Sequence, residues 1–208
     1  MERAIVFLDF ANVEIPGNSR GGLDYAHLLQ YLGEGRFLVD GYCYLPVDPR
    51  RQMERTRTID SLWEQGWNVR PKIGKIAGDT FKCNVDVEMA IDMLRAVHDI
   101  RPDILVLCSG DEDFLPVVKE VRRMGVRVEV ASFEDVAAWR LRQQASGFIS
   151  LDTYYQEWMA ERNDQSASDF SQAEASPETD QEAHSTLEAR LFPAPVPDGE
   201  IPDADRYR

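Results

Sequence analysis

The chain has 208 residues, of which 43% are hydrophobic and 10% aromatic, so it fits one ordinary domain with or without a tail. This apolar share is too high for a wholly disordered protein, and no apolar run approaches the roughly 18 residues of a membrane-spanning helix, so we expect no membrane partner. The three cysteines lack CxxC spacing, which argues against a disulfide framework or zinc knuckle and favours a reducing, cytoplasmic location.

The formal net charge of −14 is unevenly distributed along the chain. Residues 1–160 contain 25 acidic and 19 basic side chains, whereas residues 161–208 contain 12 and 4. The second segment is also polar and proline-rich, and it cannot bury enough apolar surface to offset its ordering entropy. We therefore predict a domain at 1–160 and an acidic, Pro-rich disordered tail at 161–208. A short apolar patch, Leu187–Phe192, makes the tail a candidate for binding a protein partner, although a plain spacer is the simpler interpretation.

Residues 1–160 alternate between strand-like and helix-like stretches. In chain order, the first half predicts a strand at Ala4–Leu8, a helix at Leu23–Leu32, a strand at Phe37–Val47, a helix at Arg51–Gln65 and an interrupted strand at Asn68–Ile76. The second half predicts a helix at Val85–Val97, a strand at Asp103–Cys108, a helix at Phe114–Met124, a strand at Val126–Ala131, a helix at Val136–Gln143 and a short strand at Phe148–Leu151. Apolar strands alternating with helices are typical of a parallel sheet covered on both faces. We predict an α/β fold, a three-layer α/β/α sandwich.

Two of the most apolar strands end in acidic residues. Asp9 directly follows the first strand, and Asp111 and Asp113 follow the strand that ends at Cys108. The carboxyl ends of parallel strands lie at one edge of a sheet, where sites form in folds of this kind. A single aspartate after a strand is usually a turn or helix-cap residue, so the coincidence of two such ends is what indicates a site.

A third acidic element lies between them. Asp86 falls in the first turn of a predicted helix, where the helix dipole favours an anion, and Lys82 is four residues before it. A capping acid with a local lysine would explain the same pattern. Residue chemistry alone therefore leaves two interpretations open, structural acids or a metal site formed by Asp9, Asp86, Asp111 and Asp113.

Three motifs occur in one order: Asp9-Phe-Ala-Asn12, Lys82-Cys-Asn-Val-Asp86 with Asp92 beyond it, and Ser109-Gly-Asp111-Glu-Asp113-Phe114. Together they resemble the NYN domain, in its LabA-like branch within the PIN-like nuclease group, over about residues 3–152. The resemblance implies a mainly parallel, Rossmann-like (PIN-like) sheet and metal-dependent cleavage of RNA. It also implies an acidic site at Asp9, Asp86, Asp111 and Asp113, polar companions at Asn12 and Ser109 that orient ligands or substrate, and a motif lysine at Lys82.

These residue types suit the cleavage of an anionic phosphodiester. Carboxylates alone would repel it, but carboxylates that hold a divalent cation reverse the local field. Hard oxygen ligands without a histidine or cysteine cluster favour Mg²⁺ or Mn²⁺ over Zn²⁺. We therefore expect a metal-dependent ribonuclease, with Asp9 and Asp111 as the foremost direct ligands and Asp86 and Asp113 as direct or water-mediated ones.

Substrate contact needs positive charge around such an acidic centre. Basic residues gather at Arg50–Arg57 and again at Arg70–Lys82, and from these we select Arg51, Arg55 and Lys72, with Lys82, as candidate phosphate contacts. Solvated helix and strand faces would explain the same charges. Three aromatic residues could stack on unpaired bases of single-stranded RNA or belong to the core: Tyr42, Tyr44 and Trp67.

Other functions are less consistent with the sequence. A haloacid-dehalogenase-type phosphatase would need a second aspartate two residues after Asp9, where Ala11 stands, and no GxxxxGK[ST] stretch predicts a P-loop. The alternative that remains is a non-catalytic RNA-binding or protein-interaction module on the same fold. The sequence leaves a homo-oligomer open.

Overall fold

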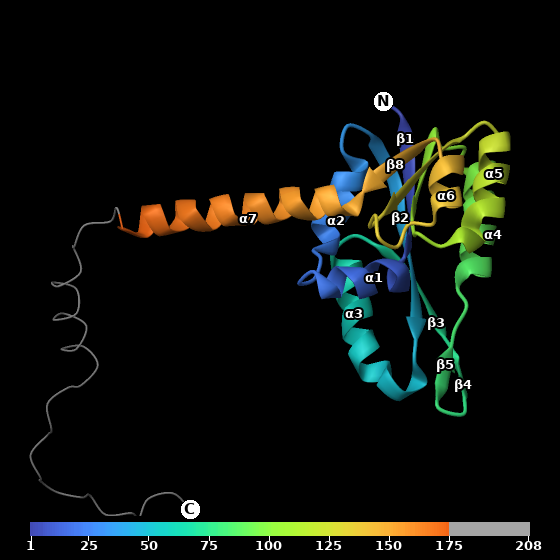
Figure 1. Ribbon diagram of the computed structural model, residues 1–208, viewed down its shortest axis with the longest axis horizontal. Helices are drawn as coiled ribbons and strands as arrows, with labels where there is room; N and C mark the ends of the chain where they lie inside the picture. Colours follow the sequence, from blue (N-terminus) through green and yellow to red (C-terminus); the bar gives the residue numbers. More distant parts are fainter. Residues whose placement is uncertain (175–208) are drawn as a thin grey trace, which may run out of the picture. The chain divides into compact units, whose positions relative to one another are not determined.

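The computed structural model of the protein describes residues 1–174, except for the side chains of residues 165–174. Six strands form one sheet, and every neighbouring pair in it is parallel. The strands are β1 (Arg3–Asp9), β2 (Phe37–Val47), β3 (Asn68–Ile73), β6 (Ile104–Cys108), β7 (Arg127–Ser132) and β8 (Gly147–Ser150). Their order across the sheet is β3-β2-β1-β6-β7-β8 (Figure 1). The strand order therefore reverses between β1 and β6, which is where ligands bind in open α/β sheets.

The helices cover both faces of this sheet. One layer contributes apolar side chains from α1 (Phe10–Ser19), α2 (Tyr25–Gly33), α3 (Gln52–Glu64) and the start of α7 (Leu151–Glu174). The opposite layer contains α4 (Asp86–Asp99), α5 (Leu115–Arg123) and α6 (Trp139–Gln144). Two short 3-10 turns, η1 (Pro49–Arg51) and η2 (Glu112–Phe114), precede α3 and α5. The predicted α/β class with a mainly parallel sheet is confirmed.

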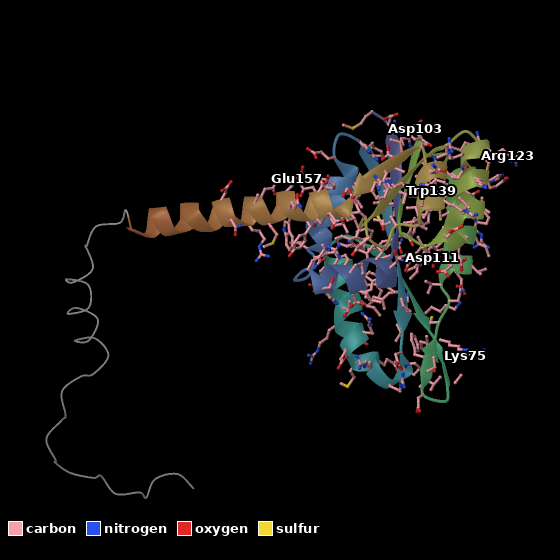
Figure 2. The ribbon with its side chains drawn as sticks, in the orientation of Figure 1. Lys75, Asp103, Asp111, Arg123, Trp139 and Glu157 are labelled. Carbon is pink, nitrogen blue, oxygen red and sulfur yellow. The ribbon has the colours of Figure 1, made fainter. Side chains whose placement is uncertain are left out.

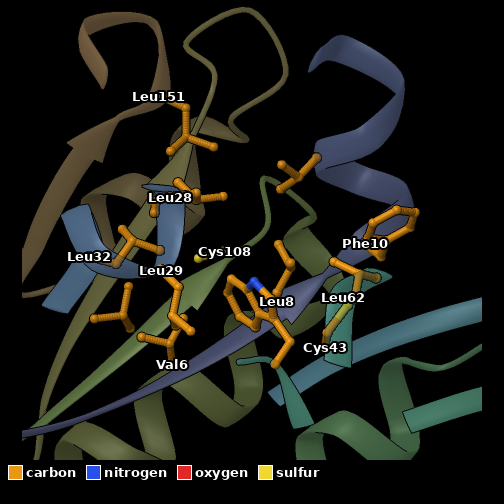
Figure 3. Close-up of a cluster of buried hydrophobic side chains, with 14 of the residues drawn as sticks. Val6, Leu8, Phe10, Leu28, Leu29, Leu32, Cys43, Leu62, Cys108 and Leu151 are labelled. Atoms are coloured by element: carbon orange, nitrogen blue, oxygen red, sulfur yellow. The ribbon is translucent and has the colours of Figure 1, made fainter. Parts of the chain in front are cut away.

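The two hydrophobic cores follow from the period-two geometry of the strands. In β1, the alternate residues Ala4, Val6 and Leu8 face one core, whereas Ile5 and Phe7 face the other. All five side chains are fully buried, as expected for a central parallel strand. Figure 3 shows the first core, where Leu28, Leu29 and Leu32 of α2 approach Val6 and Leu8. Burial on both faces fixes the register of β1, and thereby the position of its last residue, Asp9.

Three elements differ from the expectations. The sequence patterns did not predict α1, because Pro16 and Gly17 interrupt it and it has no apolar stripe. The interrupted strand at 68–76 is resolved into β3 and an antiparallel hairpin of β4 (Lys75–Ala77) and β5 (Thr80–Lys82). Residues 161–174, for which we expected disorder, continue helix α7; no proline stands in this stretch before Pro177, and alanine, glutamate and glutamine favour helix.

By its internal contacts the chain divides into two units, residues 1–160 and 161–208. The remainder of the predicted tail, residues 175–208, including the patch Leu187–Phe192, lies outside the described residues.

Within residues 1–174, no helix combines the length and apolar character that a membrane crossing requires. All three cysteines are free thiols, and Cys43 and Cys108 are buried.

Candidate metal centre

The site begins where the two central strands end. Leu8 of β1 pairs with Cys108 of β6, so Asp9 and Ser109 leave the sheet side by side. The chain then turns at Gly110, where a Cβ atom would lie 2.5 Å from the carbonyl oxygen of Val136. Only glycine therefore fits without a backbone shift, and the loop after β6 stays close to the sheet edge.

Asp9 lies at the bottom of the site. Its side chain is 5% exposed, and it caps α1 by accepting a hydrogen bond from the backbone N–H of Asn12 at 3.3 Å. It also accepts one from the hydroxyl of Ser109 at 3.1 Å. Burial raises the pKa of Asp9 to about 6, and the neighbouring carboxylates of Asp86 and Asp111 add to this increase. A negative charge here is therefore costly without a cation.

Three further carboxylates form a close group at the same edge of the sheet. Asp86 is the first residue of α4, Asp111 caps η2, and Asp113 belongs to η2. Each offers an oxygen atom, and these atoms lie within 4.8 Å of one another. We call Asp86, Asp111 and Asp113 the acidic trio. Burial raises the pKa of Asp86, the charges of Asp111 and Asp113 raise it further, and the ammonium group of Lys72 offsets only part of this increase.

The acidic trio lies at the carboxyl edge of the sheet. In Figure 2, Asp103 and Asp111 mark the two ends of the segment that contains β6. The structure thus brings Asp86, Asp111 and Asp113 together as the sequence predicted, whereas Asp9 lies outside that close group. Metal binding by any of the four remains a prediction.

Asn12 and Ser109, the two polar companions, hold this arrangement in place through hydrogen bonds. The side-chain oxygen of Asn12 accepts a hydrogen bond from the backbone N–H of Gly110 at 2.7 Å, which ties α1 to the loop after β6. Ser109 is fully buried, and its hydroxyl oxygen also accepts from the backbone N–H of Asp111 at 3.2 Å. Both residues therefore position the carboxylates. The substrate contacts expected of them stay predictions.

The predicted pairing of Lys82 with Asp86 does not appear among the described contacts. Lys82 is exposed on β5, opposite Lys75. Lys72 is the cation near the start of α4: its ammonium group donates to Glu88 at 2.5 Å and to the carbonyl oxygen of Asn84 at 2.6 Å. Lys82 belongs to strand β5 and lies outside α4, so the four-residue spacing of a continuous helix does not apply to it.

The arginine cluster separates into two kinds of residue. Arg55 forms a bidentate pair with Glu14, at 2.7 and 2.8 Å, and Arg50 pairs with Asp48 at 2.6 Å. Within residues 1–164, Arg51 has no ion-pair partner and is exposed. Arg51 is therefore free to contact a phosphate, whereas the guanidinium of Arg55 is already engaged.

The structure also reveals a contact that the sequence analysis missed. The hydroxyl of Tyr44 donates to Asp92 at 2.8 Å, so Asp92 holds α4 against β2 and lies outside the acidic trio. Tyr44 pairs in register with Asp9, which places it beside the site. The sequence contained an indication of this contact, because it has an aromatic residue on the strand next to β1 and an acid two turns into α4.

Fold and site together define a doubly wound α/β protein with a carboxylate cluster at its topological switch point. The NYN domain family model matches residues 3–152, well over half of the chain, and the chain therefore belongs to the NYN domain family. The predicted family membership is confirmed.

Named relatives agree with this assignment. The chain is 28% identical over 160 residues to the low amplitude and bright protein LabA of Synechococcus elongatus, a match covering 72% of this chain and 84% of LabA. It is 29% identical over 134 residues to the uncharacterized protein MJ0482 of Methanocaldococcus jannaschii, covering 64% of this chain and 50% of that protein. A crystal structure of the protein VPA0982 of unknown function from Vibrio parahaemolyticus has a TM-score of 0.60 and 23% identity, over 72% of this chain and 92% of that one. This last likeness concerns the fold alone.

Proposed function

We propose that this protein is a metal-dependent ribonuclease that hydrolyses phosphodiester bonds in single-stranded RNA. The observation that carries the proposal is the acidic trio, whose oxygen atoms lie within 4.8 Å of one another at the switch point of the sheet. Membership of the NYN domain family supports the nuclease interpretation. RNA binding without cleavage on the same fold is the alternative function, and metal-dependent cleavage separates the two.

The residues present fit a hard divalent cation. The trio offers only carboxylate oxygens, the ligand type that suits Mg²⁺ and Mn²⁺. The raised pKa of Asp86 reflects burial and like-charge repulsion, both of which a bound cation would relieve. Asp9 is buried, its pKa is raised to about 6, and its charge interacts with those of Asp86 and Asp111. Asp86, Asp111 and Asp113 would hold the ion directly, with Asp9 as a further or water-mediated ligand.

The chain's own residues would then prepare the reaction. Asp9 and Ser109 orient the carboxylate of Asp111 through the buried hydrogen bonds described above. Asn12 holds the loop after β6 close to the site. When bound, a divalent cation supplies activation of water and neutralisation of charge on the phosphate. The exposed cations Arg51 and Lys82 are candidates for holding the RNA backbone, whereas Lys72 and Arg55 are engaged by Glu88 and Glu14.

The proposal is tested by incubating single-stranded and structured RNA with the protein in Mn²⁺, Mg²⁺ or EDTA. We expect cleavage in Mn²⁺ or Mg²⁺, none in EDTA, and none by the variant Asp86→Asn. The matched control is Glu120→Gln on α5, an exposed acid paired with Arg123, which should cut at the parental rate. Metal-dependent RNA binding without any cleavage would favour the non-catalytic module, and cleavage by Asp86→Asn at the parental rate would contradict the site.

A further inference from the structure

A groove lies along β2 and β3 beside α4, close to the start of that helix. It consists of two adjoining hollows of about 230 and 190 Å³, which share Arg70 and Asp92 in their walls. The first hollow reaches Val85, the residue before Asp86. The second continues past Tyr42 to Arg95. A strand of RNA at the trio would therefore meet this groove next.

The structure separates the three aromatic residues that could stack on a base. Trp67 is 2% exposed and its indole N–H donates to the carbonyl oxygen of Tyr25, so it belongs to the core. Tyr44 is also 2% exposed and is bonded to Asp92. Tyr44 and Tyr42 each line one of the two hollows, but Tyr42 alone of the three aromatics is partly exposed. Of these aromatics, Tyr42 is the one that a nucleobase could reach.

The ring of Tyr42 is held in place by its neighbours. It stacks on the buried Phe7, with ring centroids 5.3 Å apart and an interplanar angle of 28°. The guanidinium of Arg70 lies over the ring, 5.4 Å from its centroid. The core therefore fixes the ring, and a base can stack on the planar guanidinium of Arg70, or on the ring itself once that side chain moves aside.

The charges of the groove favour Arg70 as the second contact. Arg95 pairs with Asp92 at 3.2 Å, and Lys72 pairs with Glu88 at 2.5 Å. Arg70 forms no ion pair with any of the described residues. Its guanidinium can therefore stack on a base or bond a phosphate without first breaking a salt bridge. The α4 wall is acidic, which directs a phosphate backbone toward the β3 side of the groove.

The strand register places Tyr42 close to the level of Asp9. Asp9 pairs in register with Tyr44, and Tyr42 lies two residues earlier on the same face of β2. Two residues of a strand span about 7 Å. A base stacked on Tyr42 would therefore belong to a nucleotide close to the one whose phosphate lies at the trio.

We propose that Tyr42 and Arg70 form a subsite that stacks an unpaired base of single-stranded RNA beside the metal centre. The subsite rests on the proposed function for its place next to the scissile phosphate, but its binding of a base can be measured without cleavage. Duplex RNA is excluded from it, because its bases are already stacked and paired.

The test measures binding of a short fluorescent oligoadenylate in EDTA, beside an abasic oligomer of equal length. Tyr42→Leu should weaken binding of the oligoadenylate about tenfold, the effect expected for one stacked base, and leave the abasic oligomer unaffected. Tyr42→Phe, which keeps the ring, should bind like the parent. Arg70→Gln should weaken oligoadenylate binding more than Arg123→Gln, an equal charge change on α5.

Three results would overturn the subsite. The first is parental affinity of both Tyr42→Leu and Arg70→Gln, the second is equal weakening for the abasic oligomer, and the third is no binding of oligoadenylate by the parent. Because Tyr42→Leu removes the stacking of this ring on Phe7, its melting temperature is compared with that of Tyr42→Phe, and Arg70→Gln tests the subsite if the leucine variant does not fold. If the parent cuts no RNA but these variants bind it more weakly, the subsite is sustained and the nuclease is refuted. If the parent cuts RNA and these variants bind it with parental affinity, the nuclease is sustained and the subsite is refuted.

Discussion

At the scale of single residues, Asp9 carries the most unfavourable charge in the site. Its pKa is raised from 3.8 to about 6, so the folded protein disfavours the ionised form. A raised carboxyl pKa means that stability falls as the pH rises from about 4 to 6, and that the decrease is complete above 6. The contribution of Asp9 should therefore make the metal-free protein less stable at pH 7.5 than at pH 4.

Replacing Asp9 with asparagine should remove this penalty. Asparagine keeps one oxygen to accept the N–H of Asn12, so we expect the metal-free variant to gain about 1–2 kcal/mol of unfolding free energy at pH 7.5. The gain should shrink toward pH 4. Denaturant unfolding in EDTA at both pH values measures it, with Asp60→Asn, an exposed acid on α3, as control. A gain that does not change with pH would show that the charge of Asp9 is not the cause.

Asp111 combines two roles that substitution can separate. Its carboxylate belongs to the acidic trio, and it also caps η2 by accepting the N–H of Asp113 at 2.9 Å. Asparagine caps as well as aspartate, whereas alanine does not. We expect Asp111→Asn to abolish cleavage while its metal-free melting temperature equals or exceeds the parental one, because repulsion falls.

The alanine variant completes this comparison. Asp111→Ala should also be unable to cleave RNA, but it should unfold more easily by about 1 kcal/mol than the asparagine variant, because the cap is missing. Cleavage rates and melting temperatures in EDTA provide both readouts. Activity retained by Asp111→Asn would exclude this residue from the site.

The sequence predicted the convergence of these residues because strand ends are easily identified. Asp9 and Asp111 each end an apolar run, and parallel neighbours must place such ends together. The burial of Asp9 could not be predicted in this way. It depends on α1, which has no recognisable helical periodicity because Pro16 and Gly17 interrupt its sequence. The role of Ser109 as a bridge depends on register, which becomes certain only once the strands are paired.

At the scale of elements, α3 and the turn before it present two unpaired arginines to solvent and hold two others, Arg50 and Arg55, in ion pairs. Arg51 and Arg57 are exposed without an ion-pair partner among the described residues, whereas Arg55 binds Glu14 of α1. The double variant Arg51→Glu, Arg57→Glu should weaken RNA binding, and the salt slope should fall by about 0.7 for each phosphate that the two arginines neutralise in the parent. Affinity measured over a series of salt concentrations in EDTA tests this. An unchanged slope would mean that this face of α3 is merely solvated.

Arg55 should behave differently from its neighbours on α3. Its guanidinium is partly buried between Glu14 and the ring of Phe10, whose centroid is 5.5 Å away. Arg55→Gln leaves the carboxylate of Glu14 without its partner, so we expect a decrease of about 1–2 kcal/mol in stability and an unchanged salt slope for RNA. The double variant Glu14→Gln, Arg55→Gln should recover part of that stability. A changed salt slope with normal stability would instead show that Arg55 binds a phosphate.

At the scale of the whole molecule, the charge is divided between a mildly acidic domain and a strongly acidic C-terminal segment. Residues 1–160 have 25 acids and 19 bases, and residues 161–208 have 12 and 4. The buried anchors of α7, Leu151 and Tyr154, belong to the first unit. We propose that the folded domain ends near residue 160 and that the segment beyond it contributes charge but not stability.

Two truncations test the stability side of this division. A chain ending after Arg162 keeps both anchors, so its melting temperature should stay within a few degrees of the parental value. A chain ending after Ser150 lacks Leu151 and Tyr154, both fully buried, and should unfold more easily by several kcal/mol, on the order of 3–5 for a large core side chain. A large fall in melting temperature on truncation after Arg162 would show that the segment packs on the domain.

The charge of the segment has its own readout in RNA binding. Residues 161–208 carry 12 acids and 4 bases, a net charge of −8, and this charge repels an RNA backbone that approaches the domain. Removing them should therefore strengthen RNA binding at low salt and have little effect at high salt, because screening weakens repulsion between separated charges. Affinities of the full chain and of the chain ending after Arg162, measured in EDTA at both salt concentrations, provide the comparison. An RNA affinity independent of the segment at every salt concentration would show that its charge does not reach the site.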